Sequence, residues 1–114
     1  MSDCLFCQIV AGRVPAKVAA ESDNSLAFYD IAPQAPVHVL VVPKRHFNGV
    51  NEVTIKHPEV FDDLMFLAQE VAKVEGIKES GYRLIFNSGP DGQQTVNHLH
   101  VHVLGGRPMT WPPG

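Results

Sequence analysis

The sequence lacks several features, and each absence argues against a class of protein. Its 114 residues include two cysteines, too few for the disulfide framework of a small secreted domain. Nine basic residues against twelve acidic ones give a net charge of −3, which argues against a broad basic face for duplex nucleic acid. No stretch reaches the roughly 18–20 apolar residues that span a bilayer, and the first residues do not resemble a signal peptide. We therefore expect a cytoplasmic protein with neither nucleic-acid nor membrane partners.

The composition is that of a folded domain. The chain is 45% hydrophobic and 18% charged, and its length suffices for one modest core, so we expect residues 1–114 to form a single domain. Apolar residues recur every three or four positions over 59–75, between Pro58 and Gly76, which predicts an amphipathic helix. A short helix is predicted over residues 5–11, where a glycine follows.

Five segments have the alternation or apolar content of β-strands. They are residues 18–22, 25–30, 37–42, 82–87 and 97–104. Most connections between them are too short for parallel crossovers, which favours antiparallel pairing. We therefore predict an α+β fold, a five-stranded antiparallel sheet meander with one long and one short helix, in which residues 44–58 form a loop.

The most informative run is His98-Leu99-His100-Val101-His102, in which three imidazoles alternate with apolar residues. In an extended strand successive side chains point to opposite faces, so the histidines would line one face while the apolar residues enter the core. Three unpaired imidazoles are costly to bury, which indicates a reactive surface for a metal or an anion. Spacing alone leaves three interpretations: histidines without a chemical role, a zinc site, or nucleophilic attack on phosphorus by one imidazole.

The segment before the histidines favours the phosphate interpretation. Asn87 ends a predicted strand, and a glycine-containing loop with Gly92, Gln93, Gln94 and Thr95 follows. Glycines let backbone N–H groups approach an oxyanion, and glutamine and threonine side chains add donors. We therefore predict that this loop contacts a phosphate.

In these motifs the chain resembles the histidine-triad (HIT) nucleotide-binding family, in particular its Hint branch. The similarity extends beyond the histidines to residues 26–38, 81–87, 92–94 and 104–114. It implies a HIT-like fold paired into a homodimer. It also implies hydrolysis of the P–N bond of purine nucleoside 5′-phosphoramidates through a covalent nucleotidyl-histidine intermediate. This chemistry releases an AMP-like nucleoside monophosphate and requires no cofactor.

The resemblance implies catalytic roles for four histidines. His100 would be the nucleophile, and His102 would hydrogen-bond phosphate oxygens or the leaving atom. His98 and His38 would orient the nucleophile and share its protons. The residues implied in nucleotide binding are Phe28, Asp30, Ile31, Asn87, Gly92, Gln93, Gln94, Thr95, His100, His102 and Trp111.

Three of these nucleotide-binding residues have more specific implied roles. Asp30 would accept hydrogen bonds from the ribose hydroxyls, and Trp111 would reach the partner's site on a C-terminal tail. Thr95 stands where serine is commonest in the family, and its extra methyl group would narrow the phosphate pocket.

Cys4 and Cys7 have the spacing of half a zinc site, although spacing alone leaves open two cysteines on a short helix with at least one buried. Some HIT proteins that resemble this N-terminus bind zinc, which implies His46 and His98 as the other ligands. A Cys₂His₂ set leaves no open position, so that zinc would be structural. It would also withdraw His98 from acid–base chemistry.

Three other functions stay open at this point. A dinucleoside polyphosphate hydrolase of the related Fhit branch is disfavoured by the short chain and by its ending, residues 111–114. A nucleotide- or protein-binding module would bind without a covalent intermediate. A metal-dependent hydrolase would lose its activity on chelation.

Overall fold

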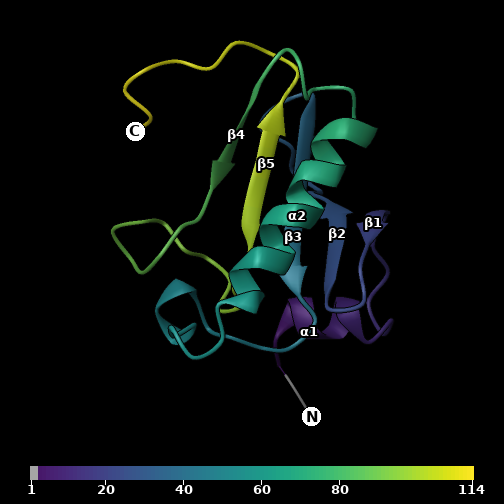
Figure 1. Ribbon diagram of the computed structural model, residues 1–114, viewed down its shortest axis with the longest axis vertical. Coiled ribbons are helices and arrows are strands. Elements are labelled where there is room, and N and C mark those ends of the chain that lie inside the picture. The colour runs from purple at the N-terminus through teal and green to yellow at the C-terminus, as the bar shows by residue number, and fades with distance from the viewer. Residues whose placement is uncertain (1–2) are drawn as a thin grey trace.

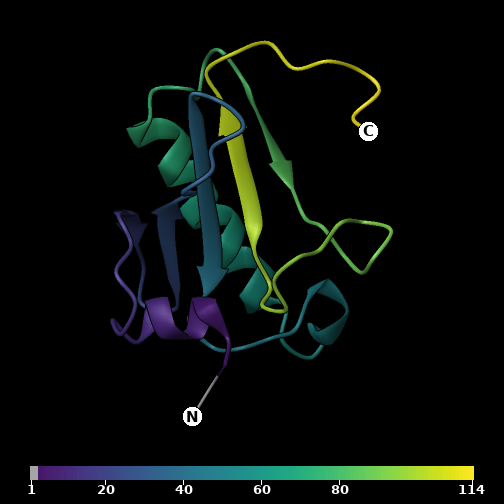
Figure 2. The same cartoon turned by 180° about the vertical axis from the view of Figure 1, so that it is seen from behind.

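The computed structural model describes residues 3–114, in which a sheet lies between a long helix on one face and a short helix on the other (Figures 1 and 2). The elements are α1 (Leu5–Val10), β1 (Val18–Glu21), β2 (Ser25–Tyr29), β3 (Val37–Pro43), the 3-10 helix η1 (Val50–Glu52), α2 (Glu59–Val74), β4 (Tyr82–Ile85) and β5 (Val101–Gly105). The predicted α+β class is confirmed. The first two residues of the predicted domain, 1 and 2, lie outside the described residues. No helix in residues 3–114 is long and apolar enough to span a membrane.

All strand pairs of the five-stranded sheet are antiparallel, as predicted, but the spatial order is β1-β2-β3-β5-β4. The sheet therefore departs from a simple meander at one place, where β5 lies between β3 and β4. Because β5 is antiparallel to both neighbours, β3 and β4 run in the same direction. Strands with this relation need a long crossover, and α2, with 16 residues, supplies it. The topology thus places the C-terminal strand inside the sheet.

Helix α2 covers one face of the sheet with the apolar stripe that the sequence predicts. Its buried residues are Leu64, Leu67, Ala68, Val71 and Ala72. They pack against inward-facing residues of β3 and β5, including Val39, Val101 and Val103. Each such buried valine or leucine contributes about 1.5–3 kcal/mol. The helix ends one residue before the predicted bound, and Gly76 follows with a φ of +74°.

The opposite face carries a smaller apolar cluster beneath α1. Phe6 of α1 packs there on side chains of β2 and β3: Leu26, Phe28, Leu40 and Val42. This helix is short. Cys4 is its N-cap residue, and Cys4 Sγ accepts a hydrogen bond from Cys7 N. The two faces therefore differ, because α2 seals one of them while α1 covers only part of the other.

The predicted strand over 97–104 begins later than expected, at Val101. Pro43 at the end of β3 has no N–H to donate, and its carbonyl oxygen accepts instead from His98 Nε2 at 2.8 Å. The alternation of faces nevertheless persists through residues 98–100. Leu99 is buried in the α2 core, while the rings of His98 and His100 both pack edge-on against Phe6.

Candidate functional site

A cavity of about 480 Å³ lies on the α1 side of the sheet, next to the histidines. Its lining combines apolar walls with a few polar groups: Leu5, Phe6, Ile9, Val14, Pro15, Ala16, Lys17, Phe28, Tyr29, Asp30, Ile31, Leu40, Thr95, Val96, His100 and His102. Its volume is in the range of small-molecule sites, about 300–1,000 Å³, and a mostly apolar lining with few polar groups is typical of them. Of the residues that the sequence implies in nucleotide binding, Phe28, Asp30, Ile31, Thr95, His100 and His102 line it.

The walls supplied by α1 and by residues 14–17 were not anticipated from the sequence. Phe6 and Ile9 are three residues apart, so they share a face of α1 and both line the cavity. That spacing is a signal that could have been used. Lys17 could not have been placed, because its position depends on its neighbour across the sheet, Tyr29, whose ring lies 5.1 Å from Lys17 Nζ.

The hydrogen bond of His100 fixes which of its ring nitrogens carries the proton. His100 Nδ1 lies 2.7 Å from the carbonyl oxygen of His98 and donates to it, because a carbonyl oxygen only accepts. In the neutral ring Nε2 therefore keeps its lone pair. Burial lowers the pKa of His100, which favours this neutral form. A neutral imidazole with an unprotonated nitrogen at a cavity is a competent nucleophile.

A second chain of hydrogen bonds joins His38 to His102. The backbone N–H of Gln34 donates to His38 Nδ1 at 3.0 Å, so neutral His38 carries its proton on Nε2. That proton points to His102 Nδ1, 2.9 Å away. His102 therefore carries its own proton on Nε2, from which it can donate to a ligand. Asp30 Oδ2 lies 3.5 Å from His38 Nε2, and its Oδ1 accepts from Ala32 N at 2.8 Å.

Two roles implied for orienting His100 differ from the contacts that the structure shows. His38 hydrogen-bonds to His102 and not to His100. His98 contacts His100 through its backbone oxygen, while the His98 ring faces the cysteines. The strand register explains the first difference, because His102 pairs with Leu40 and His38 with Leu104, which places the two histidines in adjacent rows of one sheet face.

These environments give a pH prediction for His102. Burial, and then the charges of His100 and His38, lower the pKa of His102 from 6.5 to about 4. Between these values the unfolded chain binds this proton and the folded chain does not. The contribution of His102 to the free energy of unfolding is therefore fully present above about pH 6.5. It falls as the pH is lowered toward 4, with a slope of at most about 1.4 kcal/mol per pH unit for one proton. The free energy of unfolding by urea, measured for wild type and His102→Gln at pH 7 and pH 5, tests this prediction. An equal dependence on pH in the two proteins would refute it.

The four residues implied as zinc ligands lie together: Cys4, Cys7, His46 and His98 each offer one ligand atom, and all four atoms lie within 4.8 Å of one another. Cys4 Sγ is 3.3 Å from His98 Nδ1, and Cys7 Sγ is 3.2 Å from His46 Nδ1. The two Nδ1 atoms are 3.1 Å apart. Tetrahedral zinc has Zn–S bonds of about 2.3 Å and Zn–N bonds of about 2.0–2.1 Å, which correspond to ligand separations of roughly 3.3–3.8 Å. The spacing therefore fits a metal.

The outer nitrogens of the two imidazoles support the same interpretation. His98 Nε2 donates to Pro43 O at 2.8 Å, and His46 Nε2 donates to Asn48 Oδ1 at 2.8 Å. Each ring therefore presents an unprotonated Nδ1 to the cluster, as metal-binding histidines do when an outer acceptor holds the other N–H. Burial lowers the pKa of His98, which keeps this ring neutral as a ligand must be.

A second group of potential metal ligands, Asp30, His38 and His102, does not present an unprotonated nitrogen from each of its histidines. The backbone N–H of Gln34 occupies His38 Nδ1, which leaves the proton on the Nε2 that would have to bind the metal. The two histidine clusters therefore differ in their chemistry. One suits a cation, and the other is a hydrogen-bond relay at the cavity.

Five residues that the resemblance places in nucleotide binding do not line the cavity: Asn87, Gly92, Gln93, Gln94 and Trp111. Asn87 Nδ2 donates to Gly92 O at 2.7 Å and so closes the loop. A side chain at Gly92 would place its Cβ 2.5 Å from Ser88 O, so only glycine fits there. Trp111 is 81% exposed, and Arg83 lies over its ring at 5.8 Å.

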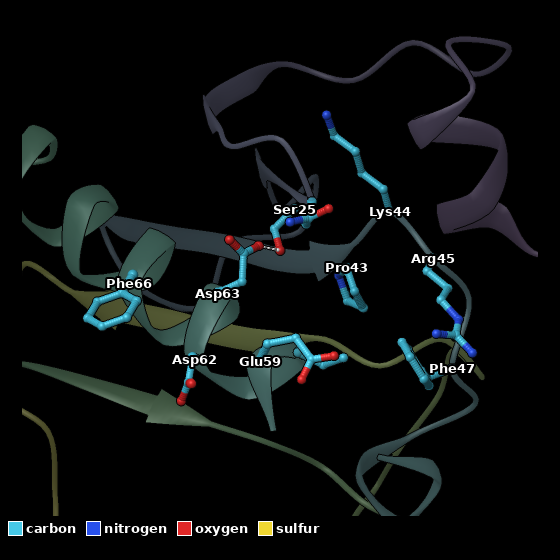
Figure 3. Close-up of a pocket in the computed structure, with 11 residues that line it drawn as sticks. Ser25, Pro43, Lys44, Arg45, Phe47, Glu59, Asp62, Asp63 and Phe66 are labelled. Carbon is cyan, nitrogen blue, oxygen red and sulfur yellow. Dashed lines mark hydrogen bonds between the residues drawn. The ribbon is translucent and has the colours of Figure 1, made fainter. Parts of the chain in front are cut away.

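Another cavity, of about 410 Å³, lies between α2 and the ends of β2 and β3 (Figure 3). Figure 3 shows Asp63 of α2 pointing toward the fully buried Ser25, whose hydroxyl donates to the carboxylate. Ser22 Oγ donates to the same carboxylate at 3.2 Å. These contacts attach α2 to the β1–β2 hairpin, and no histidine lines this cavity. The histidine-lined cavity is therefore the candidate site for chemistry.

Comparisons with known proteins show which family the chain is similar to. A family model described as "HIT domain" matches residues 11–109. A solved HIT family hydrolase from Legionella pneumophila superposes with a TM-score of 0.95, at 49% identity, covering 98% of this chain and 100% of that one. A 14 kDa zinc-binding protein of Zea mays is 45% identical over 115 residues, covering 99% of this chain and 89% of that protein. Adenylylsulfatase HINT1 of Arabidopsis thaliana is 44% identical over 115 residues, covering 99% of this chain and 78% of that protein.

The fold and the histidine-lined cavity define a histidine-triad protein, in which the first triad histidine adjoins the cysteines and the other two line the cavity. The chain belongs to the HIT domain family. The resemblance stated from the sequence motifs is thereby confirmed, and a relative named HINT1 agrees with the Hint branch.

Proposed function

We propose that this protein hydrolyses purine nucleoside 5′-phosphoramidates by transferring the nucleotidyl group to His100 and then to water. The observation that carries the proposal is the His100 ring, whose Nδ1–H is held by the His98 carbonyl while Nε2 keeps its lone pair beside the cavity. A lone pair fixed in position reduces the entropy cost of attack. The relative named as a hydrolase supports the reaction class.

The reaction takes place in two displacements. First, His100 Nε2 attacks the α-phosphorus, the N–P bond forms, and the P–N bond of the substrate breaks. The leaving nitrogen takes a proton from Nε2 of His102 in its imidazolium form, and His102 is left as the neutral ring that accepts a hydrogen bond from His38 Nε2–H. Then water attacks phosphorus, its proton returns to the histidines, and His100 is released with a nucleoside monophosphate. His98 holds the nucleophile only through its carbonyl oxygen.

The cavity walls support a nucleotide as the substrate. Phe28, with Ile31 at the rim, offers an apolar surface for a purine, and Asp30 retains acceptor capacity for ribose hydroxyls. Thr95 lines the same cavity as His100 and His102, so its hydroxyl and the His102 Nε2–H can donate to phosphate oxygens. We assign these side chains to the base, the ribose and the phosphate in that order.

We also propose that Cys4, Cys7, His46 and His98 hold a structural zinc ion. The convergent Nδ1 atoms and their outer acceptors support this, as do relatives named 14 kDa zinc-binding proteins. The ion would join the start of α1 to the segment after β3 and would supply no step of the chemistry. The cytoplasm, where thiols stay reduced, suits the two cysteines as ligands.

The assembly we propose is a homodimer of single domains spanning residues 1–114. Strand β4 is an edge of the sheet, and an uncovered edge is open to pairing with another chain. The C-terminal segment runs out past β4 in both views, which would let Trp111 reach a partner's cavity (Figures 1 and 2).

The proposal is tested by mapping the covalent intermediate. Protein would be mixed with adenosine 5′-phosphoramidate, adenylyl sulfate or diadenosine triphosphate, quenched in base and digested for mass spectrometry. We expect one AMP adduct per chain on His100, with the phosphoramidate giving the highest kcat/KM. An adduct on His102, or nucleotide binding with no adduct and no product, would overturn the proposal. Preferential turnover of the triphosphate would instead favour the dinucleoside polyphosphate alternative.

A further inference from the structure

The side-chain amide of Gln94 makes three hydrogen bonds, all of them to backbone groups. Its Oε1 accepts from Gly89 N at 3.1 Å, and its Nε2 donates to Asn48 O at 2.7 Å and to Val96 O at 3.1 Å. An amide NH₂ has two protons, so both donors of Gln94 are in use. The amide has none left for the phosphate that the sequence pattern led us to expect there.

One of these bonds, from Gln94 Nε2 to Asn48 O, connects two distant segments, because residues 48 and 94 are 46 positions apart in the sequence. One is the loop of residues 88–96, whose last two members, Thr95 and Val96, line the cavity beside His100. The other is the segment 46–49 after β3. A Cβ at Gly49 would lie 3.2 Å from Gln94 Oε1, so a glycine there allows the amide to approach closely.

Two contacts hold the segment 46–49 to the rest of the chain, and a further bond stabilises it from within. His46 belongs to the Cys/His cluster, and its Nε2 donates to Asn48 Oδ1 at 2.8 Å. The carbonyl oxygen of Phe47 accepts from Leu99 N at 2.7 Å, next to the backbone that orients His100. The segment thus provides a fixed support to which Gln94 attaches the loop.

We propose that Gln94 is a positioning residue, which clamps the 88–96 loop onto the 46–49 segment and so sets the distance between the Thr95 wall and His100. This proposal rests on the proposed function for its activity readout. The clamp itself has a readout that does not depend on any reaction, the protection of the Gly89 amide.

The test uses Gln94→Met, which keeps the length of the side chain and removes all three hydrogen bonds. The matched control is Gln69→Met, the same change at an exposed position of α2. In nucleotide-free protein we expect amide hydrogen exchange at Gly89, followed by NMR, to accelerate at least about tenfold in Gln94→Met and to stay unchanged in the control. Unchanged protection at Gly89 would overturn the clamp.

Activity and adenosine binding then separate positioning from a general loss of structure. Displacement of a cavity wall by about 1 Å can cost on the order of 10²-fold in rate, so we expect kcat on adenosine 5′-phosphoramidate to fall about 10- to 100-fold. The Kd for adenosine, which has no phosphate, should stay within about twofold of wild type. Equal losses in kcat and in adenosine affinity would refute a positioning role.

A second variant tests the clamp without changing Gln94. Gly49→Ala would place a methyl group against the Gln94 amide, and we expect the same pattern of faster Gly89 exchange, lower kcat and unchanged adenosine affinity. Faster loop exchange with unaltered kcat in both variants would show that the loop does not position the substrate. Wild-type protein without phosphoramidase activity would refute the proposed function, whereas the Gly89 exchange rates would still decide whether the clamp exists.

Discussion

Replacing His100 with glutamine should lower kcat on adenosine 5′-phosphoramidate at least about 10³-fold, which is about 4 kcal/mol in the activation barrier. Glutamine keeps the size and polarity of the side chain but has no lone pair that can form a stable bond to phosphorus. The variant should also give no AMP adduct under the quench conditions that trap it in wild type. Single-turnover kinetics would measure the chemical step directly.

The matched control for this change is His57→Gln, because His57 is exposed and contacts Glu59 away from the cavity. The control should keep wild-type kcat, and His100→Gln should bind AMP with nearly unchanged affinity because the cavity walls remain. The assignment is wrong if His100→Gln still forms an adduct, or if only His102→Gln loses it.

Removing the proposed zinc ion should cause the largest change in the free energy of unfolding among these predictions. Ligands that bind only the folded state stabilise it by about 4 kcal/mol at a free concentration 1,000 times Kd. At about 4 °C per kcal/mol, exhaustive chelation should lower the Tm of the zinc-loaded protein by about 15 °C, and added zinc should restore it. Differential scanning calorimetry with parallel metal analysis would measure both.

A variant of one proposed zinc ligand, His46, tests which residues bind the metal. His46→Gln should lower the zinc content well below one ion per chain and lower Tm, while His57→Gln, another exposed histidine replaced in the same way, should change neither. A zinc content of one ion per chain in His46→Gln would place the metal elsewhere. A metal-free wild type with unchanged Tm would refute a structural role.

The parts of this fold that could be predicted are those in which neighbouring residues carry the pattern. The stripe of α2 and the alternation through His98 and His102 depend on periods of 3.6 and 2, which need no knowledge of distant contacts. The cluster of Cys4 with His46 came from the family resemblance, and the structure brings these residues together.

What could not be predicted depends on register between distant segments. The bond between His38 and His102 follows from how β3 pairs with β5, and the position of β5 inside the sheet follows from the α2 crossover. The hydrogen bonds of Gln94 could not be predicted for a related reason. A glutamine beside a glycine loop suggests a phosphate donor, but segment 46–49 lies within reach and uses both amide protons.

The position of β5 also determines when the site can form during folding. His102 lies on β5, and His98 and His100 directly precede it. This strand pairs with β3, about sixty residues earlier, and separates β3 from β4. Such distant pairing slows folding, because a long loop must close before the contact stabilises anything. Before this pairing, the His102 ring is not held against its hydrogen-bond partner His38. The proposed site is therefore complete only after β5 has paired with β3.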